Sequence, residues 1–228
     1  KEDFIDESYI LEVSSPGLGR PLKKEKDFIV IGKDIQYQEG VIEILETEKE
    51  VDFLIISEAL PGNEKIENLI EKIKQINNEV NIVIILENKK EELKINESSI
   101  NLIGIDDPRM AHESFISDSE IVKVELDNTK YNGDKYNILL SHRPELFDTY
   151  VEKKIDLILT GHAHGGQIRI PFIGGIIAPN QGFFPKYTSG VIEKNKTTMV
   201  VSRGIGNSII PLRINNRPEL VVITLCNK

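Results

Sequence analysis

Three of the four histidines follow apolar runs that are typical of strands. His142 comes directly after the predicted strand 137–141, and His162 and His164 follow the predicted strand 156–160. Loops at the carboxyl ends of parallel strands are where such sheets place their ligands. Neutral imidazole binds zinc, manganese, iron or nickel. The three side chains therefore predict a metal site at one rim of a sheet, where we expect them to cluster.

The glycines around two of these histidines favour the same interpretation. Residues 161–167 read G-H-A-H-G-G-Q, so His162 and His164 stand two positions apart among glycines. Glycine lets the backbone turn sharply and approach a bound group closely. The alternative is that the histidines are loop residues with satisfied hydrogen bonds, which would be the better interpretation of a lone histidine. His112 has no comparable context and is predicted to lie on the surface or in a loop.

Composition excludes several other kinds of site. Cys226 is the single cysteine among 228 residues, which excludes a disulfide framework and a cysteine-based zinc site. Apolar residues make up 39% and charged residues 29%, as in soluble globular proteins, and the net charge of −9 argues against nucleic acid as a partner. No apolar run is long enough to span a bilayer. No signal peptide is visible, so a cytoplasmic location is expected for the chain as given.

Elements that alternate along the chain must position the histidines. An apolar run at 51–57, a helical pattern at 64–77 and an apolar run at 81–86 predict a small β-α-β unit. The part after residue 96 is rich in predicted strands and glycine-bearing loops. The fold class is therefore predicted to be α/β and mixed. Further strands are expected at 9–13, 101–105, 199–202, 209–214, 220–225 and around residue 168, and further helices at 39–50 and 145–154.

Two motifs carry a resemblance to a known family. Residues 138–145 (I-L-L-S-H-R-P-E) and 161–167 resemble the last two motifs of calcineurin-like metallophosphoesterases. The runs 177–182 (I-A-P-N-Q-G) and 202–208 (S-R-G-I-G-N-S) extend the likeness over about residues 96–228. The bacterial YkuE-type branch is the most similar. The resemblance implies a hydrolase, with residues 96–228 forming the strand-rich C-terminal half of an α/β/β/α sandwich.

The same resemblance implies a mechanism and a set of ligands. In this family, a hydroxide activated by two divalent metal ions hydrolyses phosphate esters. One ion would bind His142 and His162, and the other would bind His164, with manganese, zinc or iron as the metal. No further catalytic residue is assigned. Three other residues are predicted to bind the substrate: Arg143, Gly165 and Gln167.

The predicted substrate is a small phosphate ester or a lipid-like molecule. The apolar run 170–177 could face a lipid-like substrate, but a strand and turn of the sandwich is the favoured explanation of this run. Relatives in the family are often associated with membranes through an N-terminal anchor, and a membrane contact is expected only through such an anchor.

Other ligand motifs of the family are missing from the sequence. The patterns D-x-H, G-D-x-x-D and G-N-H-[DE] occur nowhere in the 228 residues. Two dications placed close together repel each other strongly, and a bridging carboxylate makes the pair tolerable. We therefore expect an incomplete site and a chain that is inactive by itself. A mosaic or truncated chain without activity of its own is the alternative.

The N-terminal residues carry two other resemblances. Residues 9–24 (Y-I-L-E-V-S-S-P-G-L-G-R-P-L-K-K) resemble part of the ribosome maturation factor RimP, over about residues 1–35. Residues 41–95 resemble part of a response-regulator receiver domain, with Ser57 in place of the phosphoacceptor aspartate, and a generic β-α-β unit explains them equally well. A ribosome-assembly binding module is therefore a less favoured function.

Charge changes at the same boundaries as the resemblances. Residues 1–35 have a net charge of −2, residues 36–95 of −7, and residues 96–228 of zero. Such shifts indicate compositional boundaries. We predict three pieces: a RimP-like strand-turn fragment at 1–35, a receiver-like fragment at 36–95 and a metallophosphoesterase-like half at 96–228.

Overall fold

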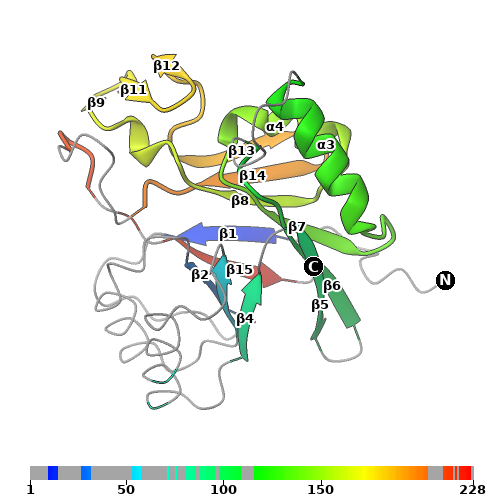
Figure 1. Ribbon diagram of the computed structural model, residues 1–228. Helices are drawn as coiled ribbons and strands as arrows, with labels where there is room; N and C mark the ends of the chain where they lie inside the picture. Colours follow the sequence, from blue (N-terminus) through cyan, green and yellow to red (C-terminus); the bar gives the residue numbers. More distant parts are fainter. Residues whose placement is uncertain are drawn as a thin grey trace. The chain divides into compact units, whose positions relative to one another are not determined.

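The chain divides into two compact units, each with its own main sheet (Figure 1). Unit 1 comprises residues 1–4 and 87–219, and unit 2 comprises residues 5–86 and 220–228. The computed structural model describes residues 10–14, 27–31, 53–57, 71, 75, 81–85, 88–95, 98–108, 116–204, 213–217, 219 and 221–226.

Unit 1 is built on a mixed six-stranded sheet. Its strand order is β13-β14-β8-β7-β6-β5. The four inner strands are parallel, and the edge strands β5 and β13 are antiparallel to their neighbours. The strands are β5 (Lys89–Ile95), β6 (Ser98–Gly104), β7 (Tyr136–Leu140), β8 (Leu157–Thr160), β13 (Gly190–Lys194) and β14 (Thr197–Val201).

The inner strands are apolar because both faces of the sheet are covered. Successive side chains of a strand point to opposite faces. The four residues 137–140 of β7 are all buried, as are four of the five residues of β14. Near-continuous apolar runs of this kind are typical of parallel strands that are buried on both sides.

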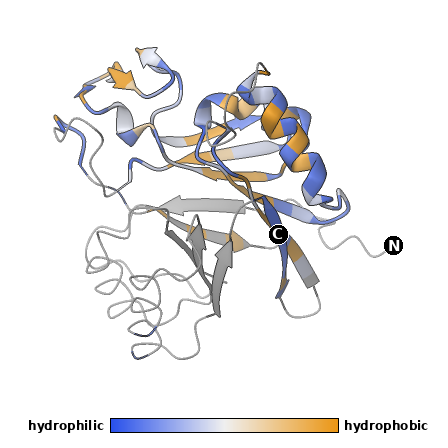
Figure 2. Cartoon of the chain, in the orientation of Figure 1, coloured by the Kyte–Doolittle hydropathy of each residue, from blue (hydrophilic) through white to orange (hydrophobic). Residues whose placement is uncertain are grey.

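Two helices pack on the sheet of unit 1. Helix α3 (Asp118–Thr129) buries Ile121, Val122 and Leu126, and helix α4 (Phe147–Glu152) follows the short 3-10 helix η3 (Pro144–Leu146). Figure 2 shows apolar and polar residues together along α3, as expected for a helix with one face in the core. The core joins both helices to β6, β7, β8 and β14.

Short elements follow β8 and lead away from the sheet. The 3-10 helix η4 (His164–Gly166) precedes two hairpins, β9 (Arg169–Ile170) with β10 (Gly174–Gly175), and β11 (Ile177–Ala178) with β12 (Gly182–Phe183). The labelled strands β9, β11 and β12 lie together in Figure 1.

Unit 2 contains a five-stranded sheet of order β1-β15-β2-β3-β4. Strands β2, β3 and β4 are parallel, and β15 is antiparallel to both β1 and β2. The strands are β1 (Ile10–Ser14), β2 (Asp27–Ile31), β3 (Phe53–Ser57), β4 (Asn81–Ile85) and β15 (Val222–Cys226). A strand from the end of the sequence therefore completes a sheet formed by its beginning.

The mixed α/β class is confirmed, and the strand-rich sheet of unit 1 is compatible with part of a calcineurin-like sandwich. Apolar runs predicted most strands within one to three residues of their observed ends. The predicted strand at 209–214 lies mostly outside the described residues, and Ile214 forms only an isolated bridge with Ile168. The predicted helix 39–50 also lies outside them, while helix 64–77 is described only at Glu71 and Gln75, both helical.

Sequence patterns missed β2, β5, β13 and α3, and also the short strands β10, β11 and β12. Strand β5 is largely polar because it is an edge strand, and Leu93 is its one residue found buried. The three predicted pieces also differ from the two compact units, since β5 belongs to unit 1 and β15 to unit 2. The separate origin of those pieces stays a prediction. No helix in the described part of the chain combines the length and apolar composition needed to cross a bilayer.

A capping box at the start of α3 gives a first prediction. The Ser117 side chain accepts from the backbone N–H of Glu120, and the Glu120 carboxylate accepts from the backbone N–H of Ser117. Ser117→Ala should destabilise α3 by about 1 kcal/mol, so its amide hydrogens should exchange roughly five times faster. Ser117→Thr is the control, because threonine keeps a hydroxyl that can cap the helix. Equal exchange rates in the two variants would contradict the role of the cap.

Candidate metal centre

The structure brings His142 and His162 together. Their ring centroids are 4.2 Å apart, with the ring planes tilted by 57°. The reason is the parallel pairing of β7 with β8, in which Leu140 lies opposite Leu159. Both strands end at the same edge of the sheet, and each histidine follows within two residues of its strand.

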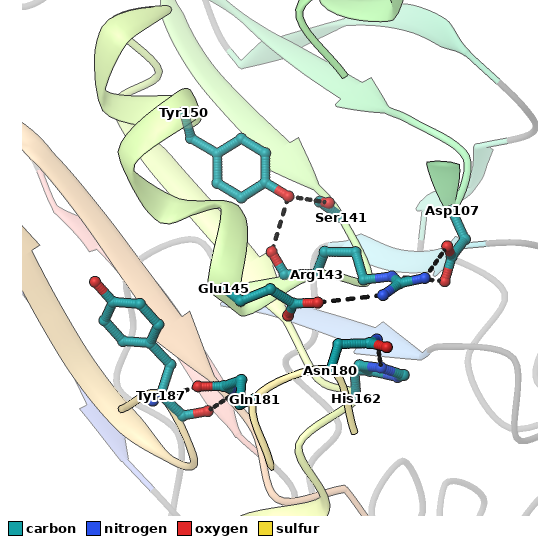
Figure 3. A network of polar contacts seen from close by, with 9 residues as sticks. All are labelled: Asp107, Ser141, Arg143, Glu145, Tyr150, His162, Asn180, Gln181 and Tyr187. Atoms are coloured by element: carbon teal, nitrogen blue, oxygen red, sulfur yellow. Dashed lines mark hydrogen bonds and ion pairs between the residues drawn. The ribbon is translucent and has the colours of Figure 1, made fainter. Parts of the chain in front are cut away.

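His162 is held by a residue that sequence reasoning did not select. The Nε2 of its ring lies 2.7 Å from Nδ2 of Asn180, in the turn between β11 and β12 (Figure 3). Burial first, then the neighbouring His142 and Arg143, lower the pKa of His162 to about 3. The ring is therefore neutral near pH 7, and Nε2 accepts while the amide donates. In the sequence, Asn180 belongs to the run 177–182, which supports the family resemblance but does not by itself indicate a partner for His162.

His164 lies in a turn whose backbone is unusual. His162, His164 and Gln167 all have positive φ, at 60°, 45° and 51°. Such angles are rare for residues with a Cβ and are found where the surrounding structure enforces them. Asn216, which is buried, donates from Nδ2 to the carbonyl of His164 at 2.6 Å and to that of Gln167 at 3.2 Å.

The glycines of this turn are required by close packing. Gly165 and Gly166 have φ of 65° and 75°. A Cβ on Gly165 would lie 2.1 Å from Oδ1 of Asn216, and one on Gly166 would lie 2.4 Å from Cα of Gly175. The turn is thus fixed between Asn216 on one side and the β10 strand on the other.

Arg143 forms a buried ion-pair network. Its side chain is only 1% exposed, and the guanidinium donates to both carboxylate oxygens of Asp107 and, at 3.2 Å, to Glu145 (Figure 3). Burial by itself would lower the pKa of Arg143, but the hydrogen bonds and charges of the two carboxylates raise it above its ordinary value. The guanidinium is therefore charged and bound to protein carboxylates.

The backbone on both sides of His142 is braced by one hydroxyl. The buried Tyr150 donates to the carbonyl of Arg143 at 2.9 Å, and its oxygen lies 2.7 Å from Oγ of Ser141 (Figure 3). Burial is the main reason why the pKa of Tyr150 is well above its ordinary value. Since Ser141 and Arg143 flank His142, this hydroxyl fixes the direction in which the histidine leaves the strand.

The predicted substrate-binding residues lie near these histidines, but their described contacts are with the protein. Arg143 binds carboxylates, the carbonyl of Gly165 accepts from Arg169 at 2.9 Å, and Gln167 is buried with its carbonyl bonded to Asn216. Contact with a substrate stays a prediction for all three. His112 lies outside the described residues.

The described residues bring two of the three predicted ligands together. His142 and His162 place two imidazoles side by side, and His164 is close enough for its charge to affect the pKa of His162. Within the part of the chain that the structure describes, no three or more His, Cys, Asp or Glu side chains are grouped so as to hold a metal ion. Nε2 of His162 is also bonded to Asn180. This arrangement does not fit a complete two-metal centre.

Comparison with known proteins relates part of the chain to proteins named as phosphoesterases. It is 37% identical over 123 residues to an uncharacterised metallophosphoesterase of Bacillus subtilis, YkuE, covering 51% of this chain and 42% of that protein. It is 36% identical over 147 residues to the uncharacterised protein YpbG of the same organism, covering 63% and 49%. It is 34% identical over 88 residues to the phosphodiesterase YaeI of Escherichia coli, covering 39% and 32%.

These likenesses show a metallophosphoesterase-like piece within the chain. The chain spans about half or less of the length of these curated relatives. No family model matches, and no solved structure matches. Nothing in these comparisons tests the RimP-like and receiver-like resemblances, which stay predictions.

The Tyr150 brace gives a second prediction. Tyr150→Phe removes two buried hydrogen bonds and should destabilise unit 1 by about 1 to 2 kcal/mol. It should also change the ring resonances of His142 and His162 in NMR spectra, because their relative orientation depends on this backbone. Tyr187→Phe is the matched control: it removes a hydroxyl from another buried tyrosine of the same core. Unchanged histidine resonances in Tyr150→Phe would contradict the positioning role.

Glu125 on α3 gives a prediction about pH. Burial, followed by the charge of Asp106, raises the pKa of this half-buried carboxyl to about 7. Between about pH 4.5 and 7 the folded chain keeps a proton that the unfolded chain releases, so stability falls as pH rises through this window. Glu125→Gln should abolish this fall of stability with pH. It should stabilise unit 1 at pH 8 by about 1 kcal/mol, a value reduced to allow for the partial exposure of the carboxyl. Near pH 4 the substitution should change stability little. The free energy of unfolding, measured with urea at several pH values, checks this. A gain in stability of Glu125→Gln that is the same at every pH would contradict the prediction.

Proposed function

We propose that unit 1 takes part in the metal-dependent hydrolysis of phosphate esters. The observation that carries the proposal is the side-by-side arrangement of the His142 and His162 rings at the ends of two parallel strands. The chain also resembles, over part of its length, proteins named as a metallophosphoesterase and a phosphodiesterase. Two imidazoles side by side at a strand-end rim are suited to binding a divalent metal.

The proposed ligands are His142 and His162 for one ion and His164 for a second, with manganese, zinc or iron as the metal. Bound divalent ions would supply positive charge that stabilises the phosphoryl oxygens. The chain's own contribution is to orient the rings: Asn180 fixes His162, while Tyr150 and the Arg143–Asp107 pair fix the backbone beside His142. Further ligands, among them a bridging carboxylate, must come from outside the described histidine cluster.

A second candidate is a chain that has no hydrolytic activity of its own. One observation favours it: the described residues bring no carboxylate together with the histidines in a group able to hold a metal. In that case the histidine turn would be an inherited feature of the fold. A role in ribosome assembly stays a prediction from the sequence alone.

Metal binding by the full chain tests the first candidate. Equilibrium dialysis against manganese, zinc or iron(II), each in a separate experiment, should show at least one tightly bound ion per chain. The double variant His142→Ala/His162→Ala should lose it, and His112→Ala should retain it. The absence of bound metal in the unsubstituted chain would contradict the proposal.

Hydrolysis of a phosphodiester such as bis(p-nitrophenyl) phosphate separates the two candidates. The first candidate predicts turnover that needs the metal and falls at least a hundredfold in His162→Ala, in line with the loss of a residue from a catalytic unit. Bound metal without turnover would support the second candidate. Turnover that the His162→Ala substitution leaves unchanged would contradict the first.

A further inference from the structure

The two hairpins that follow the histidine turn lack acidic residues. Residues 157–192 contain no Asp or Glu, although the whole chain has 37 of them and a net charge of −9. The same segment carries two basic residues, Arg169 and Lys186. The segment itself therefore adds no acidic charge that would oppose an anionic surface, although Asp148 lies near Lys186 and Glu219 lies near Arg169.

Exposed apolar side chains are concentrated on the same hairpins. Five of the nine large apolar side chains found exposed in the described residues lie between positions 170 and 184. Phe172, at the turn between β9 and β10, is fully exposed. Concentrated apolar exposure on a soluble fold marks an interaction surface. The five are Ile170, Phe172, Ile173, Phe183 and Phe184.

The exposure belongs to a fixed framework. Ile176 joins the two hairpins, because its N–H donates to the carbonyl of Ile168 at 2.8 Å and its carbonyl accepts from the N–H of Phe184 at 2.8 Å. The side chain of Gln181 bonds the backbone of Tyr187 in both directions, at 2.9 and 2.8 Å (Figure 3). A backbone that is already ordered loses little entropy when its exposed side chains are buried against a partner.

A cation stands next to the apolar groups. Lys186 is exposed, follows Phe184 by two residues and places its ammonium 4.8 Å from the centre of the Tyr187 ring. Lysine near aromatic residues is the composition found where proteins lie in the interface of an anionic bilayer. The phenyl rings can enter the acyl boundary while the ammonium stays among the headgroups.

We propose that hairpins β9–β10 and β11–β12 dock on a phospholipid bilayer that contains anionic lipids, with Phe172, Ile173 and Phe184 entering its interface. A bilayer adapts to separate protruding side chains, whereas a protein partner needs a complementary packed surface. This contact is distinct from the N-terminal anchor that the sequence suggested. The proposal does not depend on metal binding or hydrolysis.

The absence of tryptophan from the chain allows a direct test. Phe172→Trp creates a single fluorescent reporter at the turn of the first hairpin. Its emission should shift to shorter wavelength when vesicles of phosphatidylcholine and phosphatidylglycerol are added. Val124→Trp, at an exposed position on α3, is the matched control and should show no shift.

Vesicle sedimentation of the full chain gives the size of the effect. Phe172→Ser/Ile173→Ser should weaken binding at least tenfold, since each side chain loses most of its apolar transfer energy, while Val124→Ser should bind as the unsubstituted chain does. Lys186→Glu should weaken binding to the anionic vesicles but not to vesicles of phosphatidylcholine alone. His142→Ala should leave vesicle binding unchanged, which separates this proposal from the proposed function.

Three results would overturn the proposal. They are the absence of vesicle binding by the unsubstituted chain, equal binding by Phe172→Ser/Ile173→Ser, and an emission shift of Phe172→Trp that grows with protein concentration without lipid. The last result would assign the hairpins to self-association. Because the substituted side chains are exposed, circular dichroism should confirm that all variants keep the fold.

Discussion

The parallel pairing of β7 with β8 is the constraint on which the rest of unit 1 depends. It brings the ends of two buried strands to one edge of the sheet, so that His142 and His162 meet although twenty positions separate them. The pairing is stable because side chains on both faces of the two strands are buried, and those facing the helices belong to the main core. A one-residue change of register would turn one histidine away from the other.

Around this edge, strained and charged groups are held by hydrogen-bonding and ion-pair partners. The positive φ angles of His162 and His164 and the buried guanidinium of Arg143 are each unfavourable alone. Asn180, Asn216 and Asp107 compensate through hydrogen bonds and charge. Spending folding energy on such an arrangement is typical of functional sites rather than of ordinary loops. The same turn continues directly into the exposed hairpins, so the histidine rim and the proposed lipid surface share a backbone.

Unit 2 shows how composition and tertiary structure divide a chain differently. Charge shifts indicate boundaries near residues 36 and 96, whereas the chain passes from one compact unit to the other at residues 86–87 and 219–220. Strand β15 explains part of the difference, because backbone hydrogen bonds place it between β1 and β2. Polar strand β5 explains another part, since pairing with β6 assigns it to unit 1. Hydrogen bonding between backbone groups does not depend on side-chain charge, so strands can pair across a compositional boundary.

The sequence by itself determined the mixed α/β class, most strands and the placement of three histidines after strand ends. These features depend on local patterns, namely apolar runs and glycines, which act within a few residues. Tertiary structure alone decided that His142 and His162 touch, that Asn180 binds His162 and that Tyr150 and Asp107 brace the neighbouring backbone. Such contacts join residues separated by seven to thirty-six positions. They exist only after the sheet has formed, because strand ends predict which loops share an edge, whereas no local pattern encodes which side chains of those loops bond to one another.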